Sequence, residues 1–375
     1  MRISRAREKA TFPDALRAIA ILAVVVAHSG PSEKLLIHFG ISANSHIARF
    51  LSLGGYGVEL FFFLSGFLLI NLYFEKFSLQ NYMKSRMGRI YPLWVAFLLV
   101  AILQHYLLGL GPWHGVVIPP VSDLYQGWQI IVLTLTFTLW VSYALWDVVI
   151  PGGWSIQSEV AHYIFFPFVR KINLRRSFFI ILAIQLIGII CERADGQNLG
   201  VFTNLVKSWN ILHFSTTVTY FFFGILFGHL FDLDLRRKFV ESRLSIYLYL
   251  TTLSLSNLFL PIPFGNQIQA EIFVLLSVFL TFRFRNHLKG RFFSLLAQYS
   301  YCIYFVHFQY IWMISRLLTN VNPQIHLNYL GLLAFMLFST FFVSIIVSIF
   351  SYKYFEKPIL DRVRKSKFPK SWGSQ

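Results

Sequence analysis

The sequence predicts an all-α protein, a polytopic transmembrane bundle of about ten helices that forms a single domain over residues 1–375. Composition is the first observation behind this prediction, because 56% of the 375 residues are hydrophobic and only 13% are charged. Soluble domains carry about 25% charged residues, so the low value is typical of a chain surrounded by lipid. The second observation is that Lys and Arg fall in short clusters between long apolar runs, which is the pattern of cytoplasmic loops.

The first three apolar runs establish the orientation of the chain. A basic tail of about residues 1–11 precedes the first run, about 12–30, so we expect a cytoplasmic N-terminus. The second run, roughly 55–74, returns to a basic loop, and the third, about 90–110, leads into a segment without Lys or Arg. Each run is close to the length of about 20 residues that a helix needs to cross a bilayer.

The fourth apolar run does not fit a simple alternation of crossings. Runs at 128–146 and 154–169 precede a basic cluster at 170–176, which would lie outside the cell if both runs crossed fully. We therefore expect a re-entrant or broken segment near 128–154, interrupted at Pro151-Gly152-Gly153, followed by one complete crossing. Irregular backbone at membrane depth is tolerated only where protein or a cavity covers it, so the break predicts a functional cavity.

Six further apolar runs complete the predicted bundle. They lie at about 177–192, 212–231, 244–261, 267–284, 294–318 and 328–355. With ten crossings, the basic clusters at 236–238 and 283–291 and the tail 361–375 all fall on the cytoplasmic side, together with both termini. This placement accounts for the net charge of +17, so no nucleic-acid partner is expected. We expect a multi-pass protein of a cell membrane, the inner membrane of a bacterium.

Arg17 and His28 stand out in the first run, because ionisable side chains inside a span are costly and usually face the bundle interior. They are eleven residues apart, about 16 Å along a helix and close to the same face. The alternative interpretation is a snorkelling Arg17 and an interfacial His28. A buried, neutral imidazole can take a proton from a hydroxyl. The chain shows no serine or cysteine nucleophile motif, so either His28 carries the chemistry or no residue stands out for it.

Three further polar residues are candidates for the same site. Arg86 and Arg89, spaced i, i+3, would present two guanidiniums on one helical face, which suits the phosphates of a nucleotide-like ligand. An anchor at the cytoplasmic surface explains the two arginines equally well. Glu159 shares a face with Tyr163 beside the expected break, where it could orient a histidine or bind an acceptor hydroxyl. A structural role for Glu159 fits the pattern as well.

Other polar residues in apolar runs are given weaker roles. Glu59 is an unusual acid in a glycine-containing run whose main feature is close helix packing. Tyr304 and His307 share a helical face, and His307 and Glu356 fit helix packing or capping better than catalysis. The two cysteines are isolated and show no metal-ligand spacing, so no metal ion is expected.

Six segments, taken in order, make the chain resemble the acyltransferase-3 family of integral membrane O-acyltransferases. They are LRAIAILAVVVAH, GVELFFFLSGFLL, RMGRIYPLW, WSIQSEVAHYIFFP, YCIYFVH and FEKP. The resemblance covers nearly the whole chain and implies that Arg17 and His28 are the essential arginine–histidine pair. It further implies that Arg86 and Arg89 act on the acyl donor, usually acetyl-CoA. Glu59 stands where the family usually has Asp, so the charge is kept.

The function that the residues and the resemblance together predict is a transmembrane O-acyltransferase. It would move an acyl group, acetyl in most such proteins, from cytoplasmic acyl-CoA to a hydroxyl of a cell-surface or lipid-linked glycan such as an O-antigen or exopolysaccharide. His28 would deprotonate that hydroxyl or carry the acyl group itself. The alternative is a transporter or flippase of a lipid-linked sugar or small polar substrate, with Arg17, His28 and Glu159 lining its path. Binding or hydrolysis of acetyl-CoA separates the two classes.

Overall fold

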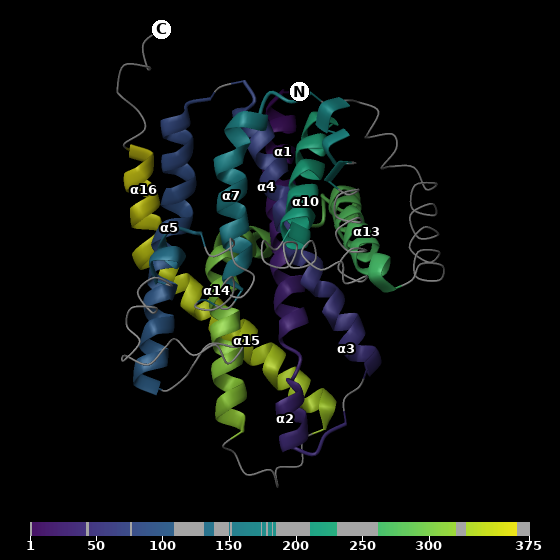
Figure 1. The fold of residues 1–375 in the computed structure, drawn as a ribbon, viewed down its shortest axis with the longest axis vertical. Coiled ribbons are helices and arrows are strands. Elements are labelled where there is room, and N and C mark those ends of the chain that lie inside the picture. Colours follow the sequence, from purple (N-terminus) through teal and green to yellow (C-terminus); the bar gives the residue numbers. More distant parts are fainter. Residues whose placement is uncertain are drawn as a thin grey trace, which may run out of the picture.

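The computed structural model describes residues 2–42, 45–75, 77–108, 131–138, 150, 152–173, 175–177, 179–181, 183–184, 211–230, 262–319 and 328–365. Within these ranges the regular structure is helical (Figure 1). The helices are α1 (Arg2–His28), α2 (Glu33–His38), α3 (Ser45–Ser52), η1 (Leu53–Tyr56), α4 (Gly57–Tyr73), α5 (Leu79–Leu108), α7 (Gly153–Val169), α10 (Ile211–Leu230), α13 (Ile262–Arg283), α14 (Arg291–Leu318), α15 (Tyr329–Ser351), the π-helical turn η4 (Tyr352–Glu356) and α16 (Lys357–Lys365).

Glycines allow α4 and α10 to form the most extensive helix contact in the described part of the chain. A Cβ on Gly66 of α4 would overlap the carbonyl oxygen of Phe221, and one on Gly224 of α10 would overlap that of Phe63. The two backbones therefore approach each other through a reciprocal pair of glycines. Small residues at such contacts are the usual means by which helices associate in lipid, where the hydrophobic effect between helices is weak.

Helix α1 lies inside the bundle and packs against α4, α13, α14 and α15. Its apolar residues from Leu16 to Val25 are mostly buried, and the backbone of η1 and α4 comes close to it at Gly54 and Gly57. A helix that is covered on most sides by other helices carries its polar side chains into the protein interior. Arg17 and His28 are thereby placed between helices.

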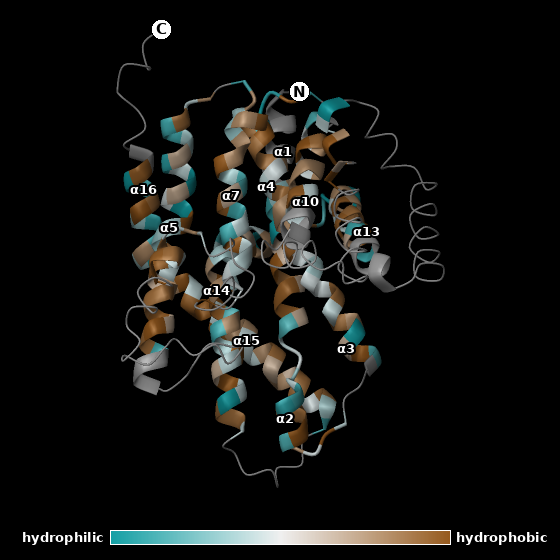
Figure 2. Ribbon diagram, viewed as in Figure 1, coloured by the Kyte–Doolittle hydropathy of each residue, from teal (hydrophilic) through white to brown (hydrophobic). Residues whose placement is uncertain are grey.

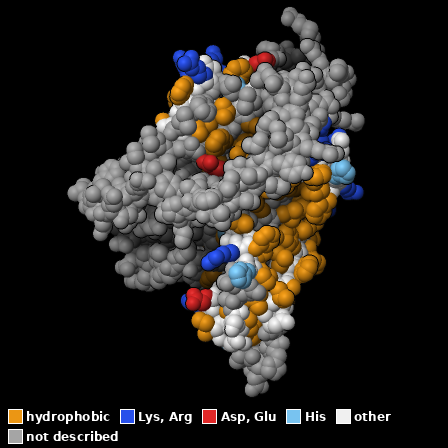
Figure 3. Space-filling view, turned by 90° about the vertical axis from the view of Figure 1, so that its right-hand side faces the viewer, with side chains coloured by type: hydrophobic (Ala, Val, Ile, Leu, Met, Phe, Trp, Pro, Cys, Tyr) orange, Lys and Arg blue, Asp and Glu red, His pale blue; other side chains and the backbone are white. Residues whose placement is uncertain are grey.

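Large exposed apolar side chains mark the outer surface. On α15, Phe338 and Phe342 are 72% and 67% exposed, and α15 is coloured mostly hydrophobic in Figure 2. Figure 3 shows hydrophobic side chains gathered in a broad patch on one side, with charged side chains toward its edges. Soluble monomers rarely expose apolar patches of more than a few hundred Å². Together with the buried polar groups inside the bundle, these surfaces indicate a membrane protein.

Three helical stretches of the described chain are long and apolar enough to cross a membrane: His46–Tyr73, Leu79–Gln104 and Tyr329–Val363. Ten crossings stay a prediction. Most of the expected re-entrant segment 128–146 and of the run 177–192, the whole run 244–261 and the basic cluster 236–238 lie outside the described residues.

The helix bounds refine several predictions from the sequence. Helix α1 begins at Arg2, so the residues of the expected basic tail form the first turns of this helix. Helix α5 begins at Leu79, and Arg86 and Arg89 therefore lie well inside a helix rather than at its start. Gly152 has a φ of 72° and α7 begins directly after it, which agrees with an interruption of the chain at this point. Only glycine adopts such a φ without strain.

Candidate functional site

His28 is the last residue of α1, and its ring is held by its own helix. Nδ1 lies 2.8 Å from the carbonyl oxygen of Val24, one turn earlier. Because a carbonyl oxygen only accepts hydrogen bonds, Nδ1 carries the proton and Nε2 of the neutral ring keeps its lone pair. The ring of Phe308 lies 4.5 Å away and that of His307 lies 5.5 Å away, both on α14. His28 therefore offers a fixed, basic nitrogen at the boundary between α1 and α14.

Glu159 on α7 is the centre of a hydroxyl cluster. Its Oε1 accepts hydrogen bonds from Ser65 of α4, at 3.1 Å, and from Tyr163, four residues further along α7. Its Oε2 accepts one from Tyr301 of α14, at 2.6 Å. A carboxylate that accepts several hydrogen bonds inside a protein is held in one orientation. Glu159 thus joins three helices, and among the described residues none of its hydrogen-bond partners is a histidine.

The two arginines of α5 lie against the tyrosine rings of this cluster. The Cζ atom of Arg86 is 5.3 Å from the ring centre of Tyr73 and 5.5 Å from that of Tyr163. The Cζ atom of Arg89 is 5.6 Å from the ring centre of Tyr301. All three distances are within the range of cation–π attraction. Tyr163 and Tyr301 therefore stand between the carboxylate of Glu159 and the two guanidiniums.

Arg17 belongs to the same group of charges. Its Nη1 lies 3.7 Å from a carboxylate oxygen of Asp14, one turn earlier on α1, and its side chain is 17% exposed. The charges or polar groups of Arg89, Glu159 and Tyr163 also act on it electrostatically. The predicted arginine–histidine pair thus occupies two separate environments along α1, with Arg17 among charges and His28 among aromatic rings.

The C-terminal motif FEKP comes to the same end of the site. Glu356, in the π-helical turn, is buried, accepts a hydrogen bond from Ser351 and is influenced by the charge of Arg89. Helix α16 then packs on α5 between the two arginines, where a Cβ on Gly88 would lie 2.9 Å from Cγ2 of Val363. π-helical turns occur frequently at functional sites. The sequence predicts a capping or packing role for Glu356. Its electrostatic interaction with Arg89 places it near the two arginines of α5.

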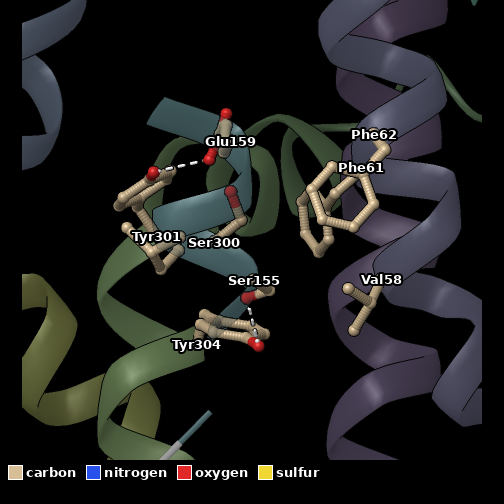
Figure 4. A pocket seen from close by; sticks show the side chains of 9 residues that line it. Val58, Phe61, Phe62, Ser155, Glu159, Ser300, Tyr301 and Tyr304 are labelled. Carbon is tan, nitrogen blue, oxygen red and sulfur yellow. Dashed lines mark hydrogen bonds between the residues drawn. The ribbon is translucent and has the colours of Figure 1, made fainter. Parts of the chain in front are cut away.

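A cavity of about 30 Å³ lies between α4, α7 and α14. Its lining residues are Val58, Phe61, Phe62, Ser155, Ile156, Glu159, Ser300, Tyr301 and Tyr304. Glu159 and Tyr301 lie at one end of it and Ser155 and Tyr304 at the other (Figure 4). A volume of this size has room for one or two water molecules or a comparably small group.

The end of the cavity nearer to His28 is formed by the start of α7. The hydroxyl of Tyr304 lies 2.6 Å from Oγ of Ser155, and both are 3.1 Å from the carbonyl oxygen of Gly152. A Cβ on Gly152 would overlap the ring of Phe308, so the backbone here touches the aromatic residue that covers His28. The start of α7, next to the predicted break, therefore adjoins the cavity, while the break itself stays a prediction.

Tyr301, Tyr304 and His307 form one polar face of α14, at i, i+3 and i+6. The ring of Tyr304 lies 5.5 Å from that of His307, which in turn neighbours His28. The face would extend about 9 Å along the helix. It connects the cluster around Glu159 with the ring of His28.

Sequence reasoning missed Ser65, Tyr301 and the contact between His307 and His28. Tyr301 and Glu159 are 142 positions apart, and Ser65 and Glu159 are 94 apart. The spacing of Tyr301, Tyr304 and His307 was a usable signal, since three polar residues on one face of an apolar helix are unusual.

Glu59 has a different environment from the other candidates. It acts electrostatically on Tyr56 and Tyr220, and its Oε2 is buried without a hydrogen-bond partner in the described structure. Within the described residues, no group of three or more His, Cys, Asp or Glu side chains is arranged to hold a metal ion.

An apolar helical bundle with ionisable side chains gathered in its interior defines a membrane protein with a buried polar site. The chain belongs to the acyltransferase-3 family, whose family model, described as an acyltransferase domain, matches residues 11–349. Acyltransferase MdmB of Streptomyces mycarofaciens is 31% identical over 176 residues, which make up 43% of the present chain. The matched segment spans only 40% of the length of that relative. No solved structure matches the chain.

Proposed function

We propose that the protein is a transmembrane O-acyltransferase that moves an acyl group, acetyl in the first instance, from cytoplasmic acyl-CoA to a hydroxyl of a cell-surface or lipid-linked glycan. The observation that carries this proposal is a series of neighbouring polar side chains that extends through the bundle, with the small cavity between Glu159 and Tyr304. The series runs from Arg86 and Arg89 through Tyr301, Glu159, Tyr304 and His307 to His28. It supplies a donor end with cations and an acceptor end with a base.

The donor end is the arginine cluster. The protein satisfies only some of the hydrogen-bond donors of Arg86. Its Nη2 donates to the hydroxyl of Tyr73 at 3.4 Å, while its buried Nε has no hydrogen-bond partner among the described residues. Guanidiniums bind phosphate oxygens in pairs of parallel hydrogen bonds. Arg86 and Arg89, with Arg17 beside them, would hold the phosphates of coenzyme A. The acyl thioester would then extend into the cavity beyond Glu159.

The acceptor end is His28. Its Nε2 would take the proton of the attacking hydroxyl as the oxygen forms a bond to the thioester carbonyl carbon. Collapse of the tetrahedral intermediate would break the carbon–sulfur bond, and the proton on Nε2 would pass to the departing thiolate. In the second route, Nε2 itself attacks the thioester carbonyl carbon, the carbon–sulfur bond breaks and the thiolate leaves. The acceptor hydroxyl then attacks the acyl-imidazole, the carbon–nitrogen bond breaks, and the hydroxyl proton passes by way of Nε2 to the thiolate. Acyl-histidine trapped by acid quench without acceptor supports the second route, and steady-state kinetics that require a ternary complex support the first.

Glu159 is assigned a positioning role. Its carboxylate fixes Ser65, Tyr163 and Tyr301 on three helices and offsets the charge of Arg17. The walls of the cavity would depend on these bonds. A cavity held in one shape lowers the entropic cost of aligning the donor with the attacking oxygen.

Ten crossings with both termini in the cytoplasm, in a bacterial inner membrane, complete the proposal. In Figure 1 the start of α1 and helix α16 lie in the same half of the molecule, which supports a common side for the two ends. Helix α16 packs on α5 at Gly88, between Arg86 and Arg89, which supports a donor site on the same side as these ends.

The proposal is tested by incubating the purified full-length protein with radiolabelled acetyl-CoA and a mixture of glycans extracted from the host membrane. We expect saturable binding of acetyl-CoA and label transferred to an alkali-labile ester. Uptake of a sugar into proteoliposomes without binding of acetyl-CoA would instead identify a transporter. Comparison of surface-glycan acetyl content between a deletion strain and its parent then names the acceptor.

A further inference from the structure

His307 carries a buried nitrogen that has no hydrogen-bond partner among the residues that the structure describes. The side chain is fully buried, at 0% exposure, and Nδ1 lies 3.1 Å from the carbonyl oxygen of Ile303 on the same helix. Nε2 is buried and has no hydrogen-bond partner in the described part of the chain. Because buried polar atoms in proteins are almost always hydrogen-bonded, an orphaned nitrogen of this kind suggests that a ligand completes it.

The hydrogen bond at Nδ1 decides what sort of ligand group fits. The carbonyl of Ile303 can only accept, so Nδ1 donates and Nε2 of the neutral ring is an acceptor. His28 has the same arrangement, with Nδ1 bonded to the carbonyl of Val24 at 2.8 Å. Each ring is tied to its own helix through one edge, so the edge that carries Nε2 points away from that helix. The two rings lie 5.5 Å apart at the boundary of α1 and α14.

Two acceptors side by side cannot hydrogen-bond each other. A ligand that satisfies both must bring two donors, close together, on one small group. Two neighbouring hydroxyls of a sugar ring meet this requirement, since each oxygen carries one hydrogen. The surrounding rings suit the same ligand: Phe308 lies 4.5 Å from His28 and 4.1 Å from His307. These rings adjoin the cavity through Tyr304, which lines it and whose ring centre lies 5.5 Å from that of His307.

We propose that His307 positions the acceptor by accepting a hydrogen bond from the hydroxyl next to the one that His28 activates. The site therefore selects sugars with two neighbouring hydroxyls and acylates one of them. This inference rests on the proposed acyl transfer at His28 and adds to it a second residue and a class of acceptor. His307 touches neither the donor nor the reacting carbonyl, and its effect lies in acceptor binding and orientation.

The magnitude follows from the cost of an unpaired buried acceptor. An acceptor sugar without the second hydroxyl leaves Nε2 of His307 unsatisfied, which corresponds to a loss of about 10- to 100-fold in kcat/KM. Replacing His307 by Phe removes the acceptor nitrogen and keeps a ring of similar size. The Phe variant should therefore lose the preference for the diol. His307→Gln, whose amide oxygen can accept a hydrogen bond, should keep part of it.

The experiment uses full-length protein in detergent with radiolabelled acetyl-CoA. The acceptors are methyl hexopyranosides of several configurations, each paired with the monodeoxy sugar that lacks one hydroxyl beside the acylated position. We expect the wild type to prefer the diol by about 10- to 100-fold, and His307→Phe to bring the ratio close to one, mainly through KM. The affinity for acetyl-CoA should not change. His162→Phe, a change at another fully buried histidine that packs on Phe221 of α10, is the matched control and should keep the wild-type ratio.

Three results would overturn the inference, and they differ from a failure of the enzyme function. An equal loss for diol and deoxy sugar in both His307 variants would assign His307 to packing. A wild type that acylates both sugars equally well, or one that binds acetyl-CoA but acylates no diol, would reject selection by His307. A wild type that neither binds acetyl-CoA nor acylates anything would reject the proposed function itself. If His307→Phe does not fold, the ratio measured with His307→Gln decides between the outcomes.

Discussion

The reciprocal glycines of α4 and α10 make a sharp prediction about the scaffold of the site. Replacing Gly66 with Ala places a Cβ on the carbonyl oxygen of Phe221, and replacing Gly224 with Ala places one on that of Phe63. Both obstacles are backbone atoms, so no side chain can rotate away. Either substitution must push the two helices apart. Ser65, next to Gly66, would then move relative to Glu159, to which it donates a hydrogen bond.

The expected loss is the difference between two opposing effects. Alanine in place of glycine inside a helix gains about 0.5–1 kcal/mol from intrinsic propensity. Overpacking a tight interface costs about 1–3 kcal/mol, and a backbone clash lies toward the upper end. We expect Gly66→Ala to lower the free energy of unfolding by about 1–2 kcal/mol. The double variant should lose less free energy of unfolding than the sum of the two single losses, because one separation of the helices removes both Cβ clashes.

Thermal unfolding in detergent, followed by circular dichroism, measures this effect. Gly55→Ala is the control, since a Cβ at Gly55 meets nothing within 4 Å. The control should be neutral or slightly stabilising, whereas Gly66→Ala and Gly224→Ala should each unfold at lower temperature. Equal midpoints for Gly55→Ala and Gly66→Ala, or strictly additive losses in the double variant, would show that α4 and α10 do not meet through these glycines.

Two further predictions concern the ends of the site. Glu159→Gln should lower the free energy of unfolding by about 1–3 kcal/mol, because the amide has one accepting oxygen where the carboxylate has two for the three hydroxyls. Chemical denaturation measures the loss, and an unchanged midpoint would mean that the hydroxyls find other partners. Arg86→Ala should raise KM for acetyl-CoA about 10- to 100-fold by removing a charged donor to phosphate, while Lys84→Ala, an exposed change on the same helix, should leave it unaltered. Equal values of KM in the two variants would reject Arg86 as a donor-binding residue.

Several long helices of this protein are readable from the sequence because each is an apolar run with a clear end. The predicted runs at 212–231, 267–284 and 294–318 correspond to α10, α13 and α14 within a few residues, except that α13 begins five residues earlier. The start of α5 was placed too late, since its first turns are polar and do not look like a span. Helix α5 extends beyond the apolar run because α16 packs against those turns. Hydropathy alone carries no information about such a contact.

The candidate site was only partly predictable. Arg17, His28, Arg86, Arg89 and Glu159 could be chosen because a charge in an apolar run is costly and needs a reason. Which hydroxyls bind Glu159 could not be read from the sequence, since that depends on how α4, α7 and α14 are arranged. His307 was assigned to packing for the same reason. Only its contact with His28, across more than 270 residues of chain, changes that interpretation.

The central claim, acyl transfer at His28 from a donor bound at the arginine end, is tested most directly in proteoliposomes. Vesicles hold the purified protein, with radiolabelled acetyl-CoA on one side of the bilayer and the glycan acceptor on the other. The account predicts ester formation by the wild type, a loss of about 100-fold or more in His28→Gln, and unchanged binding of acetyl-CoA in that variant. Ester formation by His28→Gln at the wild-type rate would contradict the account.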